Sequence, residues 1–195
     1  MEHLNRNRYK LLETRLKNGW FIIVFVSDSS FSIRRAERDD APALLDLVHE
    51  LALFEHLPPP DSAARARLIE DGWGERRRFE AFLAFVPENP APAGFCLFFE
   101  TYSSFMARPR LFIEDLYVRP DFRRRGIGTG LIKWCIEQAY ERGCWRVECM
   151  GLDWNSSAQD LYAKLGAHQF FEWFLFRFER RMIEHHLGVG PKRRF

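Results

Sequence analysis

A basic, glycine-rich turn between an apolar segment and a helix-forming one constrains this chain more than any other feature. Residues 121–134 read DFRRRGIGTGLIKW, and apolar residues then recur at helical spacing as far as Ala139. Amides in the first turn of a helix have no partner within it and lie at the positive end of its dipole. A strand, a glycine turn and a helix in this order therefore predict a site for pyrophosphate.

The usual nucleotide-binding patterns do not describe this turn. Its glycines are spaced G-x-G-x-G rather than G-x-G-x-x-G, and no Lys followed by Ser or Thr completes a P-loop. Two interpretations stay open: the glycines admit phosphate oxygens to the amides, or they serve only close packing in a basic turn. The residues assigned to the phosphate site are Arg123, Arg124, Arg125, Gly126, Ile127, Gly128, Thr129 and Gly130.

The hydrophobic pattern switches between strand and helix periods along the chain. Strands are predicted at 31–36, 78–86, 93–102, 110–118, 144–152 and 170–179, and helices at 38–55, within 58–74, after the glycines and at 156–166. Asp39 or Asp40 is expected to cap the helix at 38–55. This order predicts an α/β (α+β) domain at 31–180, with a mixed sheet and helices on its faces, between an extension, 1–30, and a C-terminal tail, 181–195, whose basic end at 191–195 is expected to be solvated.

Composition and charge exclude several classes of partner. Basic and acidic residues number 29 and 27, so no overall field marks a nucleic-acid binder. The apolar run at 20–26 follows basic residues as in a signal peptide, but it is too short to span a bilayer and Ser-Asp-Ser is a poor cleavage site. We expect a cytoplasmic protein without nucleic-acid or membrane partners, in which this run is an added strand or a hydrophobic arm.

The cysteines and histidines give no metal-binding pattern. Cys96, Cys135, Cys144 and Cys149 lack paired spacing, and the six histidines form no constellation. We expect reduced, mostly buried thiols, with Cys144 and Cys149 on opposite faces of one strand.

Three motifs, in order, resemble the GNAT superfamily of N-acetyltransferases, and more narrowly its diamine and thialysine acetyltransferase branch. The first is Arg123-x-x-Gly126-x-Gly128, which follows FIEDLYVRPDF, and the second is LDWNSSAQDLYAKLGA at 152–167. The third is formed by the flanking segments RDDAPALLDLVHELALFE at 38–55 and EWFLFRFE at 172–179. The resemblance covers about 31–180. It implies the GNAT fold with a mostly antiparallel sheet, acetyl-CoA as cosubstrate, no metal, and a homodimer. The phenylalanine-rich segment 170–178 is then interface or core material.

Acetyl transfer to an amine needs a base, donors for the developing oxyanion and a proton for the departing thiolate. Glu114 and Asp115 interrupt an apolar strand, which is costly unless they form ion pairs or serve chemistry. The resemblance implies that Glu114 is the general base, acting through water. Asp115, on the other face by strand alternation, pairs with an arginine or meets the substrate.

The remaining site residues follow from the same resemblance. Asn155 and Tyr162 lie two helical turns apart and share a face. Tyr162 is expected to protonate the thiolate, and the alternative is a half-buried amphipathic side chain. Asn155 meets the pantetheine arm or caps its helix. The amides of Leu116, Tyr117 and Val118 are expected to bind the thioester oxygen and pantetheine.

The acceptor is expected to be a small cationic amine, with Glu55, Asp115 and Glu172 as the acidic candidates that attract it. Polyamine-specific members of the branch carry Asp-Pro-Trp where this chain has Ser103-Ser104-Phe105, which favours a lysine analogue over spermidine. The alternative from another class is a non-catalytic acyl-CoA-binding regulatory module.

Overall fold

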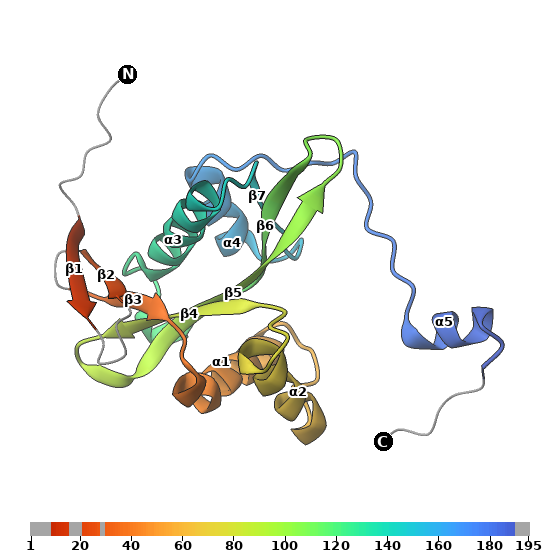
Figure 1. Ribbon diagram of the computed structural model, residues 1–195, viewed down its shortest axis with the longest axis horizontal. Coiled ribbons are helices and arrows are strands. Elements are labelled where there is room, and N and C mark those ends of the chain that lie inside the picture. The colour runs from red at the N-terminus through yellow and green to blue at the C-terminus, as the bar shows by residue number, and fades with distance from the viewer. Residues whose placement is uncertain (1–8, 16–20, 28–29, 190–195) are drawn as a thin grey trace. The chain divides into compact units, whose positions relative to one another are not determined.

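A mixed, mostly antiparallel sheet organises the chain. The computed structural model describes residues 9–15, 21–27 and 30–189, the first two ranges by their backbone alone. In these ranges seven strands follow the order β1-β2-β3-β4-β5-β6-β7, and only β6 and β7 run parallel (Figure 1). The strands are β1 Tyr9–Arg15, β2 Phe21–Ser27, β3 Ser32–Arg35, β4 Glu80–Val86, β5 Asn89–Ser103, β6 Arg108–Val118 and β7 Val147–Cys149. The predicted sheet type is confirmed.

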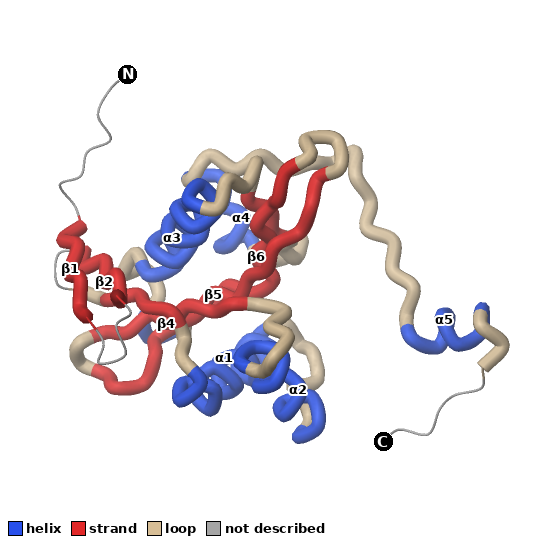
Figure 2. The backbone as a smooth tube through the Cα atoms, viewed as in Figure 1, coloured by secondary structure: helices blue, strands red, loops and turns tan. Residues whose placement is uncertain are grey.

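Helices cover both faces of this sheet. α1 Ala41–Phe54 and α2 Ser62–Trp73 lie on one face and α3 Ile127–Glu141 on the other (Figures 1 and 2). Leu131 and Cys135 of α3 pack on Phe82 and Phe98, whose stacked rings lie 5.2 Å apart. A second core on the α1 face includes Leu47. The later helices are α4 Ser156–Lys164 and α5 Arg180–His186.

The first two helices begin in different ways. Asp61 caps α2, because its carboxylate accepts from the amide of Ala64 at 2.8 Å. Asp40 precedes α1, but its carboxylate accepts from the amide of Glu37 at 2.8 Å and from Arg34 at 2.6 Å, so it makes no side-chain cap of α1. The predicted cap at Asp40 is therefore wrong in its bonding, because an arginine of the neighbouring strand takes the carboxylate.

The apolar run near the N-terminus is a strand, as predicted. β2 lies between β1 and β3, and its Phe25 and Val26 pair with Ile33 and Ser32 of β3. The extension thereby continues the sheet beyond β3. The basic end at 191–195, predicted to be a solvated tail, lies outside the described residues.

The predicted strand at 170–179 is wrong, and β7 is much shorter than the strand predicted at 144–152. Residues 170–178 have no regular structure, and α5 follows them. A strand needs a neighbour for its amides and carbonyls, and no described strand pairs with this segment. Before β7 the chain turns at Gly143 (φ 67°), and the Trp145 amide donates to the carbonyl of Pro109. Pairing, rather than composition, limits both segments.

The cysteines are free, with no disulfide among the described residues. Cys96 and Cys135 are fully buried with their sulfurs 3.3 Å apart, while Cys144 and Cys149 are half-buried. Cys144 and Cys149 pack against the same core, so the predicted opposite faces are wrong, because Cys144 precedes β7.

The chain divides into two compact units, residues 1–161 and 162–195. The first contains the whole sheet with α1, α2 and α3. The second contains the end of α4, the segment 170–178 and α5. The division at residues 30 and 180 expected from the sequence stays a prediction.

Candidate active site

The two predicted carboxylates lie at a β-bulge in β6. Asp115 pairs with Leu97 of β5 while Ile113 pairs with Phe98, so Glu114 is an extra residue on β6. Glu114 is exposed. Asp115 is half-buried on the α1 face of the sheet, the face that Leu97 shares. The sequence places Glu114 and Asp115 on opposite faces because side chains alternate along a strand. The bulge interrupts this alternation at Glu114.

This bulge sets which backbone amides reach the free edge of β6. The amide of Arg119 donates to the carbonyl of Ala93 in β5 at 2.9 Å. Because successive residues of a strand face alternate neighbours, the amides of Leu116 and Val118 point to the opposite edge. β7 pairs with β6 only along residues 111–113, so no described strand covers this edge after the bulge. Two donors thus lie beside the carboxylates, as the oxyanion and pantetheine roles require.

Tyr117, the third residue of the predicted donor set, is placed differently. It pairs with Phe95, and the alternation turns its amide toward β5. Its side chain is buried at 7% exposure in the core on the α1 face. The direction of the Tyr117 amide therefore does not support its assignment to the cofactor. Its ring belongs to the row of aromatic rings described below.

Asp115 has the electrostatic character of a base at neutral pH. Burial raises the pKa of its carboxyl to about 7, and the negative charges of Glu114 and Glu55 act in the same direction. A general base works best when its pKa lies near the working pH. The structure thus gives Asp115 a property that the sequence did not assign to it.

The glycine turn presents unpaired amides at the start of α3. Gly126 precedes the helix with φ 85°, in the left-handed region that favours glycine. The first bond of the helix ladder runs from the amide of Gly130 to the carbonyl of Gly126, at 2.9 Å. The amides of Ile127, Gly128 and Thr129 precede this bond and have no partner within the helix. A helix start whose first amides have no partner within the helix, the arrangement that suits an anion, is thus present at the glycine turn.

The other two glycines are required for packing. A Cβ at Gly130 would lie 2.8 Å from the ring of Phe31 and 3.0 Å from Ile33. A Cβ at Gly128 would lie 3.1 Å from Leu161. Both interpretations of the glycines therefore hold, at different positions.

The three arginines of the turn have three different surroundings. Arg123 donates through Nε to the carbonyl of Val118 at 2.9 Å, and its guanidinium lies 4.8 Å from the ring centre of Phe54. Arg125 forms an ion pair with Glu88. Arg124 is exposed and has no hydrogen bond or ion pair with the described part of the chain. Among the three, Arg125 alone is paired with an acid, and Arg124 alone has no polar contact with a described residue.

Comparison with known proteins agrees with this geometry. Residues 44–167 match the model of the Acetyltransferase (GNAT) family. The chain belongs to the GNAT family. Thialysine N-epsilon-acetyltransferases of Bos taurus and Caenorhabditis elegans are 36% and 35% identical to it, over 75% and 79% of this chain and 91% and 95% of theirs.

More distant relatives agree with the same assignment. An L-ornithine N5-acetyltransferase of Arabidopsis thaliana is 30% identical, over 74% of this chain and 82% of its own. A solved structure of a probable acetyltransferase has the same fold, with a TM-score of 0.67, 21% identity, and coverage of 75% of this chain and 96% of its own. This GNAT protein is thus an acetyl-CoA-dependent acetyltransferase that transfers an acetyl group to an amine.

A row of aromatic rings that the sequence did not reveal lies at the end of α1 in this GNAT acetyltransferase. Ring centres of Phe54 and Tyr117 lie 6.2 Å apart, those of Phe54 and Trp154 lie 5.5 Å apart, and those of His56 and Trp154 lie 5.9 Å apart. Glu55 is half-buried at the end of α1, next to Phe54 and His56 in the chain, and its role toward the acceptor stays a prediction. The only sequence signal was the run FEH, which ends the first amphipathic segment.

Asn155 caps α4 in the GNAT domain. Its Oδ1 accepts from the amide of Ala158 at 3.3 Å and from the hydroxyl of Ser157 at 3.2 Å. Of the two alternatives for this residue, the cap is the one observed. Tyr162 lies on α4 and Glu172 in the segment 170–178, both in the second unit, and their roles stay predictions.

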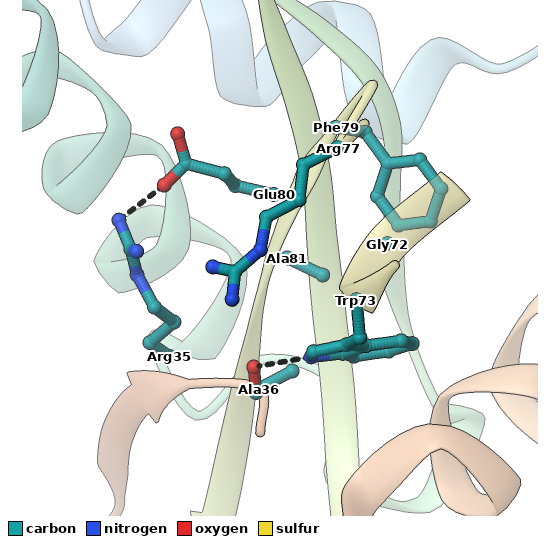
Figure 3. Close-up of a pocket in the computed structure, with 8 residues that line it drawn as sticks. All are labelled: Arg35, Ala36, Gly72, Trp73, Arg77, Phe79, Glu80 and Ala81. Atoms are coloured by element: carbon teal, nitrogen blue, oxygen red, sulfur yellow. Dashed lines mark hydrogen bonds and ion pairs between the residues drawn. The ribbon is translucent and has the colours of Figure 1, made fainter. Parts of the chain in front are cut away.

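A pocket between α2 and the strands β3 and β4 lies apart from the residues assigned to acetyl transfer (Figure 3). Its lining residues are Arg35, Ala36, Gly72, Trp73, Arg77, Phe79, Glu80 and Ala81. The indole of Trp73 donates to the carbonyl of Ala36 at 3.2 Å, and Glu80 pairs with Arg35 and Arg142. Most of its polar groups are thus engaged with one another, and none of the predicted site residues lines it.

The described ranges contain neither a metal-binding group nor a membrane-spanning helix. No three His, Cys, Asp or Glu side chains in them are arranged to hold a metal ion. None of their helices combines the length and apolar character needed to cross a bilayer.

Proposed function

We propose that this acetyltransferase moves the acetyl group of acetyl-CoA to the primary amine of a small cationic substrate, lysine-like or a diamine, by direct attack. One arrangement carries the proposal: the carboxylates of Glu114 and Asp115 adjoin the edge amides of Leu116 and Val118. The names of the relatives support the acceptor class, since thialysine and L-ornithine are both amino acids with a terminal amine.

Each chemical event has a residue in this proposal. The amine nitrogen attacks the carbonyl carbon of the thioester, while the edge amides donate to the oxygen that gains charge. The amine proton passes through water to Glu114, the base that the resemblance implies, and Asp115 shares this proton as a coupled partner. The carbon–sulfur bond then breaks, and the sulfur takes a proton from the phenol of Tyr162.

Cofactor binding is assigned to the turn and the helix that follows it. The amides of Ile127, Gly128 and Thr129 would hold the pyrophosphate, with Arg124 supplying charge. On the acceptor side, Glu55, Asp115 and Glu172 are proposed to attract a cationic amine. The sequence Ser103-Ser104-Phe105 in place of Asp-Pro-Trp favours an amino acid over a polyamine.

Thiol release with a panel of amines tests the function. Purified protein with acetyl-CoA should release coenzyme A with L-lysine, thialysine or L-ornithine, faster than with spermidine and far faster than without amine. Calorimetry with coenzyme A runs in parallel. Binding of coenzyme A without release in the presence of any amine would favour the acyl-CoA-binding module instead.

We also propose a homodimer that buries the aromatic segment 170–178. Seven large apolar side chains of this segment are between 66% and 82% exposed in the single chain. Covering them would remove on the order of 1,000 Å² per copy from water, which is enough for a stable interface. Each alternating face of the segment is apolar apart from one charged residue, Glu172 on one face and Arg177 on the other. A cytoplasmic location is proposed as well, and the free cysteines support it.

Light scattering after size exclusion tests the dimer. The wild-type protein should elute as a dimer, and Phe174→Ser with Phe176→Ser should weaken it at least tenfold. Phe105→Ser is the control, since Phe105 is 95% exposed in the β5–β6 hairpin. A wild-type monomer at 100 µM would contradict the proposal.

A further inference from the structure

His56 occupies a backbone conformation that other residues adopt at lower cost. It follows α1 with φ 59°, and the amide of Leu57 donates across it to the carbonyl of Ala52 at 2.8 Å. This is the helix-ending motif whose left-handed position is normally Gly or Asn, because a Cβ there costs about 1–2 kcal/mol. Histidine is one of the few non-glycine residue types enriched at positive φ, and it adds to this position a hydrogen-bonding ring that glycine lacks.

The imidazole of His56 lies at the acceptor side of the site. Its ring packs on Trp154 at 5.9 Å, and the row continues through Phe54 to Tyr117, two residues after Asp115 on the same strand. Glu55, the adjacent residue in sequence, is close enough to Asp115 for its charge to act on that carboxyl. His56 directly follows Glu55 in the chain, so the Cα atoms of the two residues lie about 3.8 Å apart.

The imidazole also keeps its hydrogen-bonding capacity. No hydrogen bond or ion pair joins it to another described residue, and it is exposed. Arg123, the other donor near the ring row, is held in place by its Nε bond to the carbonyl of Val118 and by its contact with the ring of Phe54. An imidazole donates a hydrogen bond in either protonation state, so His56 can bind an anionic group at any pH at which the enzyme works.

Charges at this end of the site are arranged for a substrate that carries both signs. The acids Glu55 and Asp115 suit an ammonium group, which every candidate amine has. A diamine has no group for a donor to bind, whereas an amino acid has a carboxylate. We infer that His56 is a specificity-determining residue that binds the α-carboxylate of an amino-acid acceptor and so favours it over the matching diamine. This inference rests on the proposed function.

L-lysine and cadaverine test it, because they differ only in that carboxylate. In the wild-type protein, kcat/KM should be higher for L-lysine. His56→Asn and His56→Gly should lower kcat/KM for L-lysine about tenfold or more and leave the value for cadaverine within twofold. Both replacements tolerate the left-handed backbone, and glycine should even stabilise the fold. His49→Asn, on an exposed part of α1, is the control.

The outcomes separate this inference from the proposed function. Equal losses for both amines, or no loss for L-lysine, would overturn the role of His56 while leaving the acetyltransferase intact. If the wild-type protein acetylates neither amine nor any other of the panel, the proposed function fails. Calorimetric binding of L-lysine and cadaverine to wild-type and His56→Gly protein with coenzyme A then decides the role of His56: a loss confined to L-lysine supports it, and any other result overturns it.

Discussion

Arg123 donates through Nε to the carbonyl of Val118 at 2.9 Å. Val118 is one of the residues whose polar backbone groups face the free edge of β6, so this bond satisfies a carbonyl that β7 does not reach. The same guanidinium lies 4.8 Å from the ring centre of Phe54 and 5.8 Å from that of Tyr117. Arg123, the first arginine of the turn, thus connects the free edge of β6 to the end of α1.

Replacing Arg123 should therefore disturb the acceptor side more than the cofactor side. For Arg123→Met we expect kcat/KM for the amine to fall about tenfold, because the edge carbonyl loses its charged donor and Phe54 loses its stacked cation. KM for acetyl-CoA should stay within threefold. The converse pattern, a higher KM for acetyl-CoA with unchanged amine kinetics, would return Arg123 to the pyrophosphate.

Arg124 should show that converse pattern. Arg124→Ala removes the arginine of the turn that has no hydrogen bond or ion pair with a described residue, and we expect the Kd for coenzyme A to rise about tenfold. Raising the salt concentration should weaken coenzyme A binding by the wild-type protein more than coenzyme A binding by the variant. Arg67→Ala, on an exposed position of α2, is the control for loss of a positive charge. Equal effects of the two variants would leave Arg124 without a role.

Asp115 should give the enzyme a titration near neutral pH. Since burial raises the pKa of its carboxyl to about 7, kcat/KM for the amine should rise as pH increases through that value. In Asp115→Asn this inflection should disappear, while in Glu114→Gln activity should fall about a hundredfold at every pH. An inflection near pH 7 that persists in Asp115→Asn would exclude Asp115 as its source.

The same group should influence stability with the opposite sign. The folded protein holds this proton up to about pH 7, whereas an unfolded aspartate loses it near pH 3.9, so stability falls as pH rises across this interval. Partial exposure reduces the full effect of about 1.4 kcal/mol per pKa unit. Denaturant unfolding should find Asp115→Asn more stable than wild type by roughly 1–3 kcal/mol at pH 8 and unchanged at pH 4.

Tyr162→Phe tests the proton donor. Without the phenol, turnover should fall about a hundredfold at moderate pH, while the affinity for acetyl-CoA stays nearly intact, because only the step that protonates sulfur is affected. Tyr140→Phe removes a hydroxyl from a tyrosine of α3 that is 86% exposed and should have no effect. Unchanged turnover in Tyr162→Phe would remove Tyr162 from its role.

Gly130→Ala tests the packing role of the last glycine. The added Cβ would lie 2.8 Å from the ring of Phe31, so we expect a loss of about 1–3 kcal/mol in the free energy of unfolding. Combining it with Phe31→Ala removes the contact, and the double variant should lose less than the sum of the two single changes. Strict additivity would mean that the ring of Phe31 is not what excludes a side chain at this position.

Local pattern was sufficient for much of this fold. Strands, helices and the turn between β6 and α3 were predicted because side-chain periodicity and glycine placement act over a few residues. The same reasoning failed at the C-terminal end, because strand formation there depends on pairing with a segment that is distant in sequence. The segment 170–178 has the aromatic composition typical of a strand, but a strand exists only where another backbone pairs with it.

The sequence by itself determined the glycine turn that starts α3, the adjacent carboxylates and the membership of the family, since these depend on residue type and order. Tertiary structure decided which backbone amides face the free edge of β6 and which of the two carboxyls has a raised pKa. Pairing with β5 makes Glu114 a bulge and turns the amides of Leu116 and Val118 to the free edge. Burial together with the charges of Glu114 and Glu55, the latter far away in sequence, gives Asp115 its raised pKa. Such properties arise from neighbours that only folding brings together.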